Sequence, residues 1–188
     1  MSERDIMSIL KQFGMTDIIT PKPLIAFTDG SCIGNGNANA KGGFSVVWPY
    51  EQEYNVSITM KSETHGAITN NRAELYGILN AFDIANKIDT SSKKTLTIYS
   101  DSKLLVKSMN EWMRKWKQNN WTKVDKTPVL NRDLLEILDK HMSSRSWIIH
   151  HVRAHTNKQD FESKWNAVAD KLAHDASTQM TLRGFSYT

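Results

Sequence analysis

The stretch that decides the fold is Leu96-Thr97-Ile98-Tyr99-Ser100-Asp101-Ser102. Its first four residues alternate in polarity, which predicts a buried β-strand. The strand ends on the carboxylate of Asp101 and passes at once into a helix-like segment. In open α/β sheets, ligands bind in the crevice beyond the carboxyl ends of the strands. We therefore predict an α/β fold in which Asp101 faces a ligand site.

The segments on either side of this strand complete one mixed sheet. Apolar runs predict further strands at residues 24–28, 44–48, 54–60 and 146–152. Helical spacing predicts a helix that follows the capping residues 69–71 and ends near Lys87, and further helices at 102–109, 110–118, 129–142 and 163–177. The first three strands suggest an antiparallel meander. Three strands, then a helix, a strand, helices, a strand and a helix indicate one sheet covered by helices.

Composition permits a polyanionic partner without requiring one. The chain of 188 residues has 24 Lys+Arg and 20 Asp+Glu, a net charge of +4. Residues 102–123 carry six cations against Glu111 alone, a local charge of +5. Cys32 is the only cysteine, which fits a reducing compartment, cytoplasmic or nuclear. We expect no secretion signal and no membrane association, because no apolar run is long enough to span a bilayer.

The N-terminal segment has an apolar pattern of its own. Ile6, Ile9, Leu10 and Phe13 recur at helical spacing. We interpret them as a short helix that docks on the domain, with a partner-binding tail as the alternative. The prolines at positions 21 and 23 then form a connector.

Four acidic residues stand where the predicted elements can gather them. Asp29 and Asp101 end strands, while Glu74 and Asp170 lie on first or second turns of helices, at the border of the buried face. Mg²⁺ prefers oxygen ligands, and two such ions about 3.5–4 Å apart stabilise both the attacking and the leaving oxygen of a phosphoryl displacement. The alternative from the pattern alone is that an Asp at a strand end caps a turn.

Four blocks carry a resemblance to a known family. They are Thr28-Asp29-Gly30-Ser31-Cys32, Thr69-Asn70-Asn71-Arg72-Ala73-Glu74-Leu75, Tyr99-Ser100-Asp101-Ser102 and Asn166-Ala167-Val168-Ala169-Asp170-Lys171-Leu172-Ala173. Together, and in this order, they resemble type 1 ribonuclease H, the bacterial and eukaryotic enzyme that cuts the RNA of RNA–DNA hybrids. The resemblance implies an N-terminal extension and linker (1–23), a catalytic domain (24–178) and a C-terminal tail (179–188).

The resemblance also implies a fold and a chemistry. The fold would be ribonuclease H-like, a five-stranded mixed sheet with three antiparallel strands and two parallel additions, flanked by helices. Asp29, Glu74, Asp101 and Asp170 would hold two Mg²⁺ ions, with Mn²⁺ as a substitute, and hydrolysis would leave 5′-phosphate and 3′-hydroxyl ends. His155 would assist proton transfer or product release, although its spacing to Asp170 is longer than in the bacterial enzyme.

Substrate contacts follow from the same match, and the substrate would be an RNA–DNA hybrid duplex. RNA is distinguished by its 2′-hydroxyl. Two groups of residues are expected to contact the hybrid: the loop and helix start, with Gly30, Asn35, Thr69, Asn70, Asn71 and Arg72, and a basic protrusion, with Trp112, Arg114, Lys115, Trp116 and Lys117. Plain helix capping at 69–71 and a helix anchored by its two tryptophans are the alternatives.

Three rival functions stay open from sequence. The first is another nuclease of the same superfamily, such as a transposase, integrase or junction resolvase. The second is a hybrid-binding module without catalysis. The third, a zinc site built from Cys32, His150, His151 and His155, is disfavoured because His150 and His151 are adjacent on a strand and point to opposite faces. A monomer is the default expectation.

Overall fold

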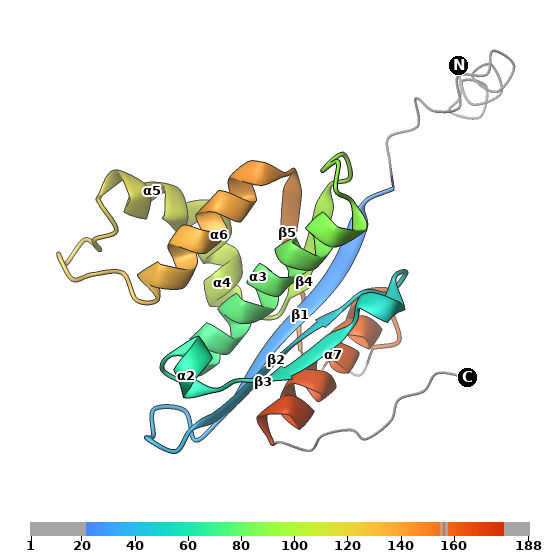
Figure 1. Cartoon of the computed structure of the whole chain (residues 1–188), viewed down its shortest axis with the longest axis horizontal. Helices are drawn as coiled ribbons and strands as arrows, with labels where there is room; N and C mark the ends of the chain where they lie inside the picture. The colour runs from blue at the N-terminus through green and yellow to red at the C-terminus, as the bar shows by residue number, and fades with distance from the viewer. Residues whose placement is uncertain (1–21, 155, 157, 179–188) are drawn as a thin grey trace, which may run out of the picture.

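A computed structural model describes residues 22–154, 156 and 158–178. Its five strands form one sheet in the order β3-β2-β1-β4-β5 (Figure 1). They are β1 (Leu24–Ile33), β2 (Lys41–Val47), β3 (Val56–Thr59), β4 (Leu96–Ser100) and β5 (Trp147–His151). The first three strands pair antiparallel, and β4 and β5 add in parallel. The predicted fold class, with its three antiparallel and two parallel strands, is confirmed.

Helices cover both faces of the sheet (Figure 1). They are α2 (Ser62–His65), α3 (Asn70–Ile88), α4 (Lys103–Lys107), α5 (Met113–Gln118), α6 (Arg132–Ser144) and α7 (Phe161–Ser177), with a short helix η2 (Gln52–Tyr54) and a π-helical turn η3 (Ser108–Trp112). α3 packs on one face with α6 against it, and α7 packs on the other face. The predicted helix at residues 1–13 lies outside the described residues.

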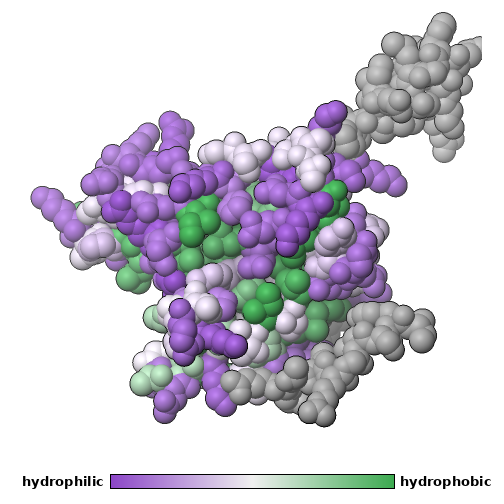
Figure 2. Space-filling view, viewed as in Figure 1, coloured by the Kyte–Doolittle hydropathy of each residue, from purple (hydrophilic) through white to green (hydrophobic). Residues whose placement is uncertain are grey.

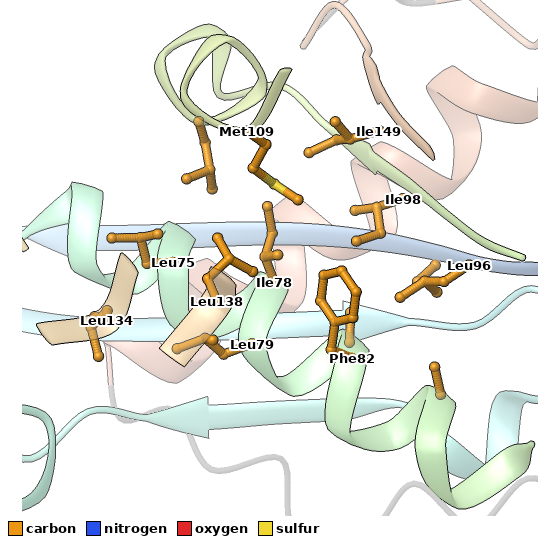
Figure 3. Packing of buried hydrophobic residues seen from close by; sticks show 14 of the residues in the cluster. Leu75, Ile78, Leu79, Phe82, Leu96, Ile98, Met109, Leu134, Leu138 and Ile149 are labelled. Atoms are coloured by element: carbon orange, nitrogen blue, oxygen red, sulfur yellow. The ribbon is translucent and has the colours of Figure 1, made fainter. Parts of the chain in front are cut away.

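The main core lies between α3, α6 and the sheet. Leu75, Ile78, Leu79 and Phe82 share one side of α3 and point toward β4, β5 and α6 (Figure 3). The helix begins where Thr69 accepts a hydrogen bond at Oγ1 from the backbone N–H of Arg72 (3.3 Å). This bond satisfies one of the free N–H groups of the first turn. The predicted helix and its buried side are confirmed.

Strand β1 is longer than the sequence predicts. Its parallel pairing with β4 stops at Thr28, but its antiparallel pairing with β2 continues to Ile33. Asp29 therefore lies inside a strand and not at its end, which corrects the prediction. Gly30 is required there, because a Cβ on Gly30 would lie 2.2 Å from the backbone N of Glu74. The missing side chain lets α3 approach β1 closely.

The helical region after β4 also differs in detail. The two predicted helices form one run, α4 and α5 joined by the π-helical turn Ser108–Trp112. α6 begins later than predicted, at Arg132, because Asn131 has the left-handed backbone conformation (φ 58°). α7 begins earlier, at Phe161, because Asp160 caps it by accepting a hydrogen bond from Ser163 N (2.8 Å).

Candidate active site

Three of the four predicted carboxylates come together at the centre of the sheet. One carboxylate oxygen from each of Asp29, Glu74 and Asp101 lies within 4.8 Å of the other two. Asp29 comes from β1, Glu74 from the second turn of α3, and Asp101 follows the last residue of the neighbouring strand β4. Among the described residues this is the one group of three or more acidic, His or Cys side chains close enough to share a metal ion.

The fourth carboxylate lies on the same hollow but outside that tight group. Asp170 and the three clustered carboxylates line one open depression, together with Gly30 and Asn70 among others. Asp170 stands on the third turn of α7, because that helix begins at Phe161, so the prediction of a first or second turn is wrong. The negative charge of Asp170 nevertheless acts on the cluster, because it raises the pKa of Asp29.

The cluster is electrostatically costly without a cation. Burial, followed by the charges of Asp101 and Asp170, raises the pKa of Asp29 to about 8. Burial and the charges of Asp29 and Asp101 raise the pKa of Glu74 well above its usual range. Glu74 Oε2 is buried and has no hydrogen-bond partner among the described residues. Acceptor oxygens that are crowded and unpartnered fit a hard divalent cation, which takes carboxylate ligands.

The start of α3 is tied to the loop between β1 and β2. Asn35 Oδ1 accepts a hydrogen bond from the backbone N–H of Asn70 (3.1 Å). Gly30 and Asn70 both line the acidic hollow. The structure thus brings Gly30, Asn35 and Asn70, three of the residues predicted to contact the hybrid, to one side of the cluster. Thr69 is the residue that caps the helix.

Arg72 is engaged inside the protein. Its two Nη atoms donate to both carboxylate oxygens of Asp133 (2.9 and 2.7 Å), and its Nε donates to the carbonyl oxygen of His65 (3.0 Å). The side chain of Arg72 is 11% exposed. Its forked pairing joins the start of α3 to the start of α6. The contact with the hybrid predicted for Arg72 stays a prediction, whereas the hydrogen bonds of Arg72 within the protein are observed.

The predicted protrusion begins at the π-helical turn and continues through α5. The rings of Trp112 and Trp116 lie 5.7 Å apart, and both line a hollow of about 250 Å³ between α3, the π-helical turn and α6. Asn71 and Glu74 line the same hollow. The two tryptophans are half-buried, so part of each ring packs inside the protein and part is open to solvent. Around them, the surface over α5 and the loop that follows is mostly hydrophilic (Figure 2).

The cations of the protrusion are not equivalent. Arg114 and Lys115 are exposed, and neither makes an ion pair with a described residue. Lys117 Nζ instead pairs with Asp139 of α6 at 2.8 Å. Arg114 and Lys115 are therefore the predicted cations most available to a phosphate backbone.

One residue beside the site was not expected from sequence. His151 Nε2 lies 3.2 Å from the backbone carbonyl oxygen of Asp101. The contact follows from the parallel register of β4 and β5, which pairs His151 with Ser100, and nothing local in the sequence signals it. His150 points the other way, with its ring 5.3 Å from that of Tyr99. His155 lies outside the described residues.

The mixed sheet, with acidic side chains gathered where β1 and β4 meet α3, defines the ribonuclease H-like class of α/β protein. The family model RNase H matches residues 21–178, and the chain belongs to this family. Ribonuclease H of Clostridium botulinum is 30% identical over 165 residues, covering 86% of this chain and 99% of that protein. Ribonuclease HI of Haemophilus influenzae is 30% identical over 167 residues, covering 89% and 97%.

Solved structures agree on the fold. The PFV RNase H domain has a TM-score of 0.67 and 24% sequence identity, covering 83% of this chain and 94% of that one. LC11-RNase H1 in complex with an RNA/DNA hybrid has a TM-score of 0.57 and 20% identity, covering 84% and 98%. Residues 22–154, 156 and 158–178 contain no helix that is both long and apolar enough to cross a membrane.

Proposed function

We propose that this protein is an endonuclease that hydrolyses the RNA strand of RNA–DNA hybrids without sequence preference, leaving 5′-phosphate and 3′-hydroxyl ends. The observation that carries the proposal is the group of Asp29, Glu74 and Asp101, with an unpartnered buried oxygen on Glu74. A protein that only bound a polyanion would gain nothing from buried carboxylates that repel it. Membership of the RNase H family gives the substrate class.

The cofactor we propose is a pair of Mg²⁺ ions, with Mn²⁺ as a substitute. Asp29, Glu74 and Asp101 would hold them, with Asp170 completing the set from α7. The bound ions would supply an activated water and charge stabilisation for both the attacking and the leaving oxygen. The carboxylates would hold the ions in place, and the missing side chain of Gly30 lets Glu74 lie close to Asp29. We also propose that His155 helps to move a proton near the products.

Recognition of the hybrid would be divided between two surfaces. Asn35, Asn70 and the backbone at Gly30 would contact the RNA 2′-hydroxyls beside the cluster, because these polar groups lie on one rim. Asn71 and the tryptophan-lined hollow would receive the DNA strand. Lys115 and its neighbours on the protrusion, Arg114 and Lys117, would neutralise DNA phosphates. Thr69, and more weakly Arg72, would add phosphate contacts at the start of α3.

Cleavage of labelled duplexes over a range of Mg²⁺ and Mn²⁺ concentrations tests this function. The protein is expected to cut the RNA of a hybrid and to leave double-stranded DNA and double-stranded RNA intact. Asp101→Asn should lose at least about a hundredfold in rate, because the amide removes ligand charge. Asp83→Asn on the exposed side of α3 is the matched control. No cleavage at any metal concentration, or normal cleavage by Asp101→Asn, would refute the proposal.

Two properties accompany the proposal. We propose that the protein works as a monomer, which light scattering checks directly. We also propose a reducing compartment, cytoplasmic or nuclear, because Cys32 is the only cysteine.

The length of RNA that the site requires can be measured in the same cleavage assay. A hybrid with a single ribonucleotide is compared with a hybrid that has a longer RNA run.

A further inference from the structure

Hydroxyl groups of β2 and β3 donate hydrogen bonds to the backbone of α7, which packs on this part of the sheet (Figure 1). The bonds are Ser45 Oγ to Ala169 O (2.7 Å), Ser57 Oγ to Leu172 O (2.8 Å) and Thr59 Oγ1 to Ala176 O (2.7 Å). The accepting carbonyl groups are three or four residues apart, so they lie on one side of the helix. The three bonds have the same chemistry and differ in their distance along α7 from Asp170.

Ser45 is the member of this set that lies beside the acidic cluster. It is fully buried, and its partner across the antiparallel strands is Asp29. Directly paired residues of two antiparallel strands point to the same face of a sheet, so Ser45 and Asp29 both face α7. The acceptor of the Ser45 hydroxyl is Ala169, the residue before Asp170. One buried hydrogen bond therefore links the strand pair that carries Asp29 to the turn of α7 that carries Asp170.

The helix approaches β2 closely enough for this bond because small residues face each other. A Cβ on Gly43, two residues before Ser45, would lie 2.5 Å from the Cβ of Ala176. Ala169 and Ala173, on the side of α7 that faces the sheet, are fully buried. A hydrogen bond between two oxygens forms only over about 2.5–3.0 Å. The bond from Ser45 to Ala169 therefore fixes the separation of α7 and β2 at this point.

The opposite face of the same strand pair is packed by α3. A Cβ on Gly77 would lie 3.4 Å from the carbonyl oxygens of both Asp29 and Ser45. Gly77 follows Glu74 by three residues on α3. This strand pair thus lies between the helix that carries Glu74 and the helix that carries Asp170. How α7 is held at this pair sets the position of Asp170 relative to the other three carboxylates.

We propose that Ser45 is a positioning residue of the metal site, whose hydroxyl holds the Ala169 carbonyl and thereby fixes the place of Asp170 beside the cluster. The inference rests on the proposed function, because it takes Asp170 as part of the ligand set. Without the bond, α7 would keep its apolar packing, but Asp170 would lose its fixed distance from Asp29. Groups that orient metal ligands typically contribute about ten- to a hundredfold to metal affinity or activity.

Titration of the full-length protein with Mg²⁺ in a calorimeter, without hybrid, tests the proposal. Ser45→Ala should weaken Mg²⁺ binding by about tenfold. Ser57→Ala and Thr59→Val are the matched controls, because each removes the same kind of bond one or two turns further along α7. Both controls should bind Mg²⁺ as wild type does. Wild-type affinity in Ser45→Ala, or equal weakening in all three variants, would overturn the proposal.

The cleavage assay adds a second readout. Ser45→Ala should need about tenfold more Mg²⁺ for half of its maximal rate. Its KM for the hybrid at saturating Mg²⁺ should stay unchanged, because the residues expected to contact the hybrid lie on the loop after β1, on α3 and on the protrusion. A raised KM with an unchanged Mg²⁺ requirement would contradict a role in positioning the metal site.

A double-mutant cycle separates positioning from a general loss of stability. Ser45→Ala and Thr59→Val should each lower the melting temperature in EDTA by about 2–4 °C, because each loses one hydrogen bond. Asp170→Ala removes the carboxylate through which Ser45 is proposed to act, so adding Ser45→Ala to it should weaken Mg²⁺ binding no further. Additive losses of Mg²⁺ affinity would contradict action through Asp170. Wild-type protein that binds Mg²⁺ but cuts no hybrid would refute the proposed function alone.

Discussion

The acidic cluster should make the metal-free protein less stable as pH rises. The pKa of Asp29 is raised from 3.8 to about 8, so between pH 5 and 7 its carboxyl is protonated in the folded protein and ionised in the unfolded chain. The folded state then binds one proton more than the unfolded state. Stability falls with pH wherever that holds, and the loss is absent below about pH 4 and complete above about pH 8.

The size of this effect follows from the same shift. One extra bound proton changes the free energy of unfolding by about 1.4 kcal/mol per pH unit, so the loss from pH 5 to 7 is about 3 kcal/mol. For a chain of this size, that corresponds to a fall of about 6–12 °C in melting temperature. Glu74 adds to the fall, because burial raises its pKa in the same direction.

Calorimetry in EDTA at pH 5, 6 and 7 measures the effect. Asp29→Asn carries no titrating group, so its melting temperature should rise relative to wild type as pH increases. Glu63→Gln on the exposed helix α2 is the control, and it should follow wild type. Mg²⁺ should raise the wild-type melting temperature more at pH 8 than at pH 5, because it binds the ionised cluster. A constant difference between Asp29→Asn and wild type from pH 5 to 7 would refute the reasoning.

Three further predictions concern the parts that support the site. Gly30→Ala should cost about 3 kcal/mol or more in folding free energy and abolish cleavage, because its Cβ would lie 2.2 Å from Glu74 N; denaturant unfolding and the cleavage assay check this. Arg72→Lys should cost about 1–2 kcal/mol by the same unfolding measurement, because an ammonium cannot reproduce the forked bonds to Asp133. Lys115→Ala should raise KM for the hybrid about two- to fivefold and reduce the slope of log KM against log salt by about 0.9, measured from 50 to 200 mM salt.

Two variants at exposed positions serve as controls for these predictions. Arg132→Lys alters an exposed pair with Glu136 on one helix and should change stability by less than about 0.5 kcal/mol. Lys87→Ala removes an exposed cation at the far end of α3 and should leave both KM and its salt dependence unchanged. If Lys87→Ala weakens hybrid binding as much as Lys115→Ala does, the effect comes from net charge alone, and the proposed phosphate contacts of the protrusion are refuted.

Local periodicity was enough to predict most elements of the fold. The apolar spacing of α3 predicts the C-terminal end of this helix within one residue. The predicted strand β1 is too short, because Asp29-Gly30-Ser31 has the composition of a turn. The structure keeps it extended through pairing with β2, which continues to Lys41. A long-range pairing of this kind overrides local preference, and no local pattern encodes it.

The site shows the same division. The family blocks led to all four carboxylates, but the spacing of Asp170 from the tight group depends on how α7 crosses the sheet, and sequence does not give that geometry. Arg72 was expected to face the substrate, yet its partner Asp133 is 61 residues away along the chain. The contact of His151 with the Asp101 carbonyl likewise exists only because of the register between two parallel strands.

The acidic cluster is held together by backbone packing that is independent of the carboxylates. Gly30 lets α3 approach β1. The apolar side of α3 packs into the main core, and Leu75, the residue after Glu74, is part of that core. Burial of these apolar side chains stabilises the core and thereby holds Glu74 beside Asp29, although the two carboxylates repel each other. A bound cation would relieve that repulsion. The fold therefore presents a preorganised ligand set, and changes at Gly30 should disturb metal affinity and stability together, whereas Asp29→Asn should weaken metal binding while stabilising the metal-free protein.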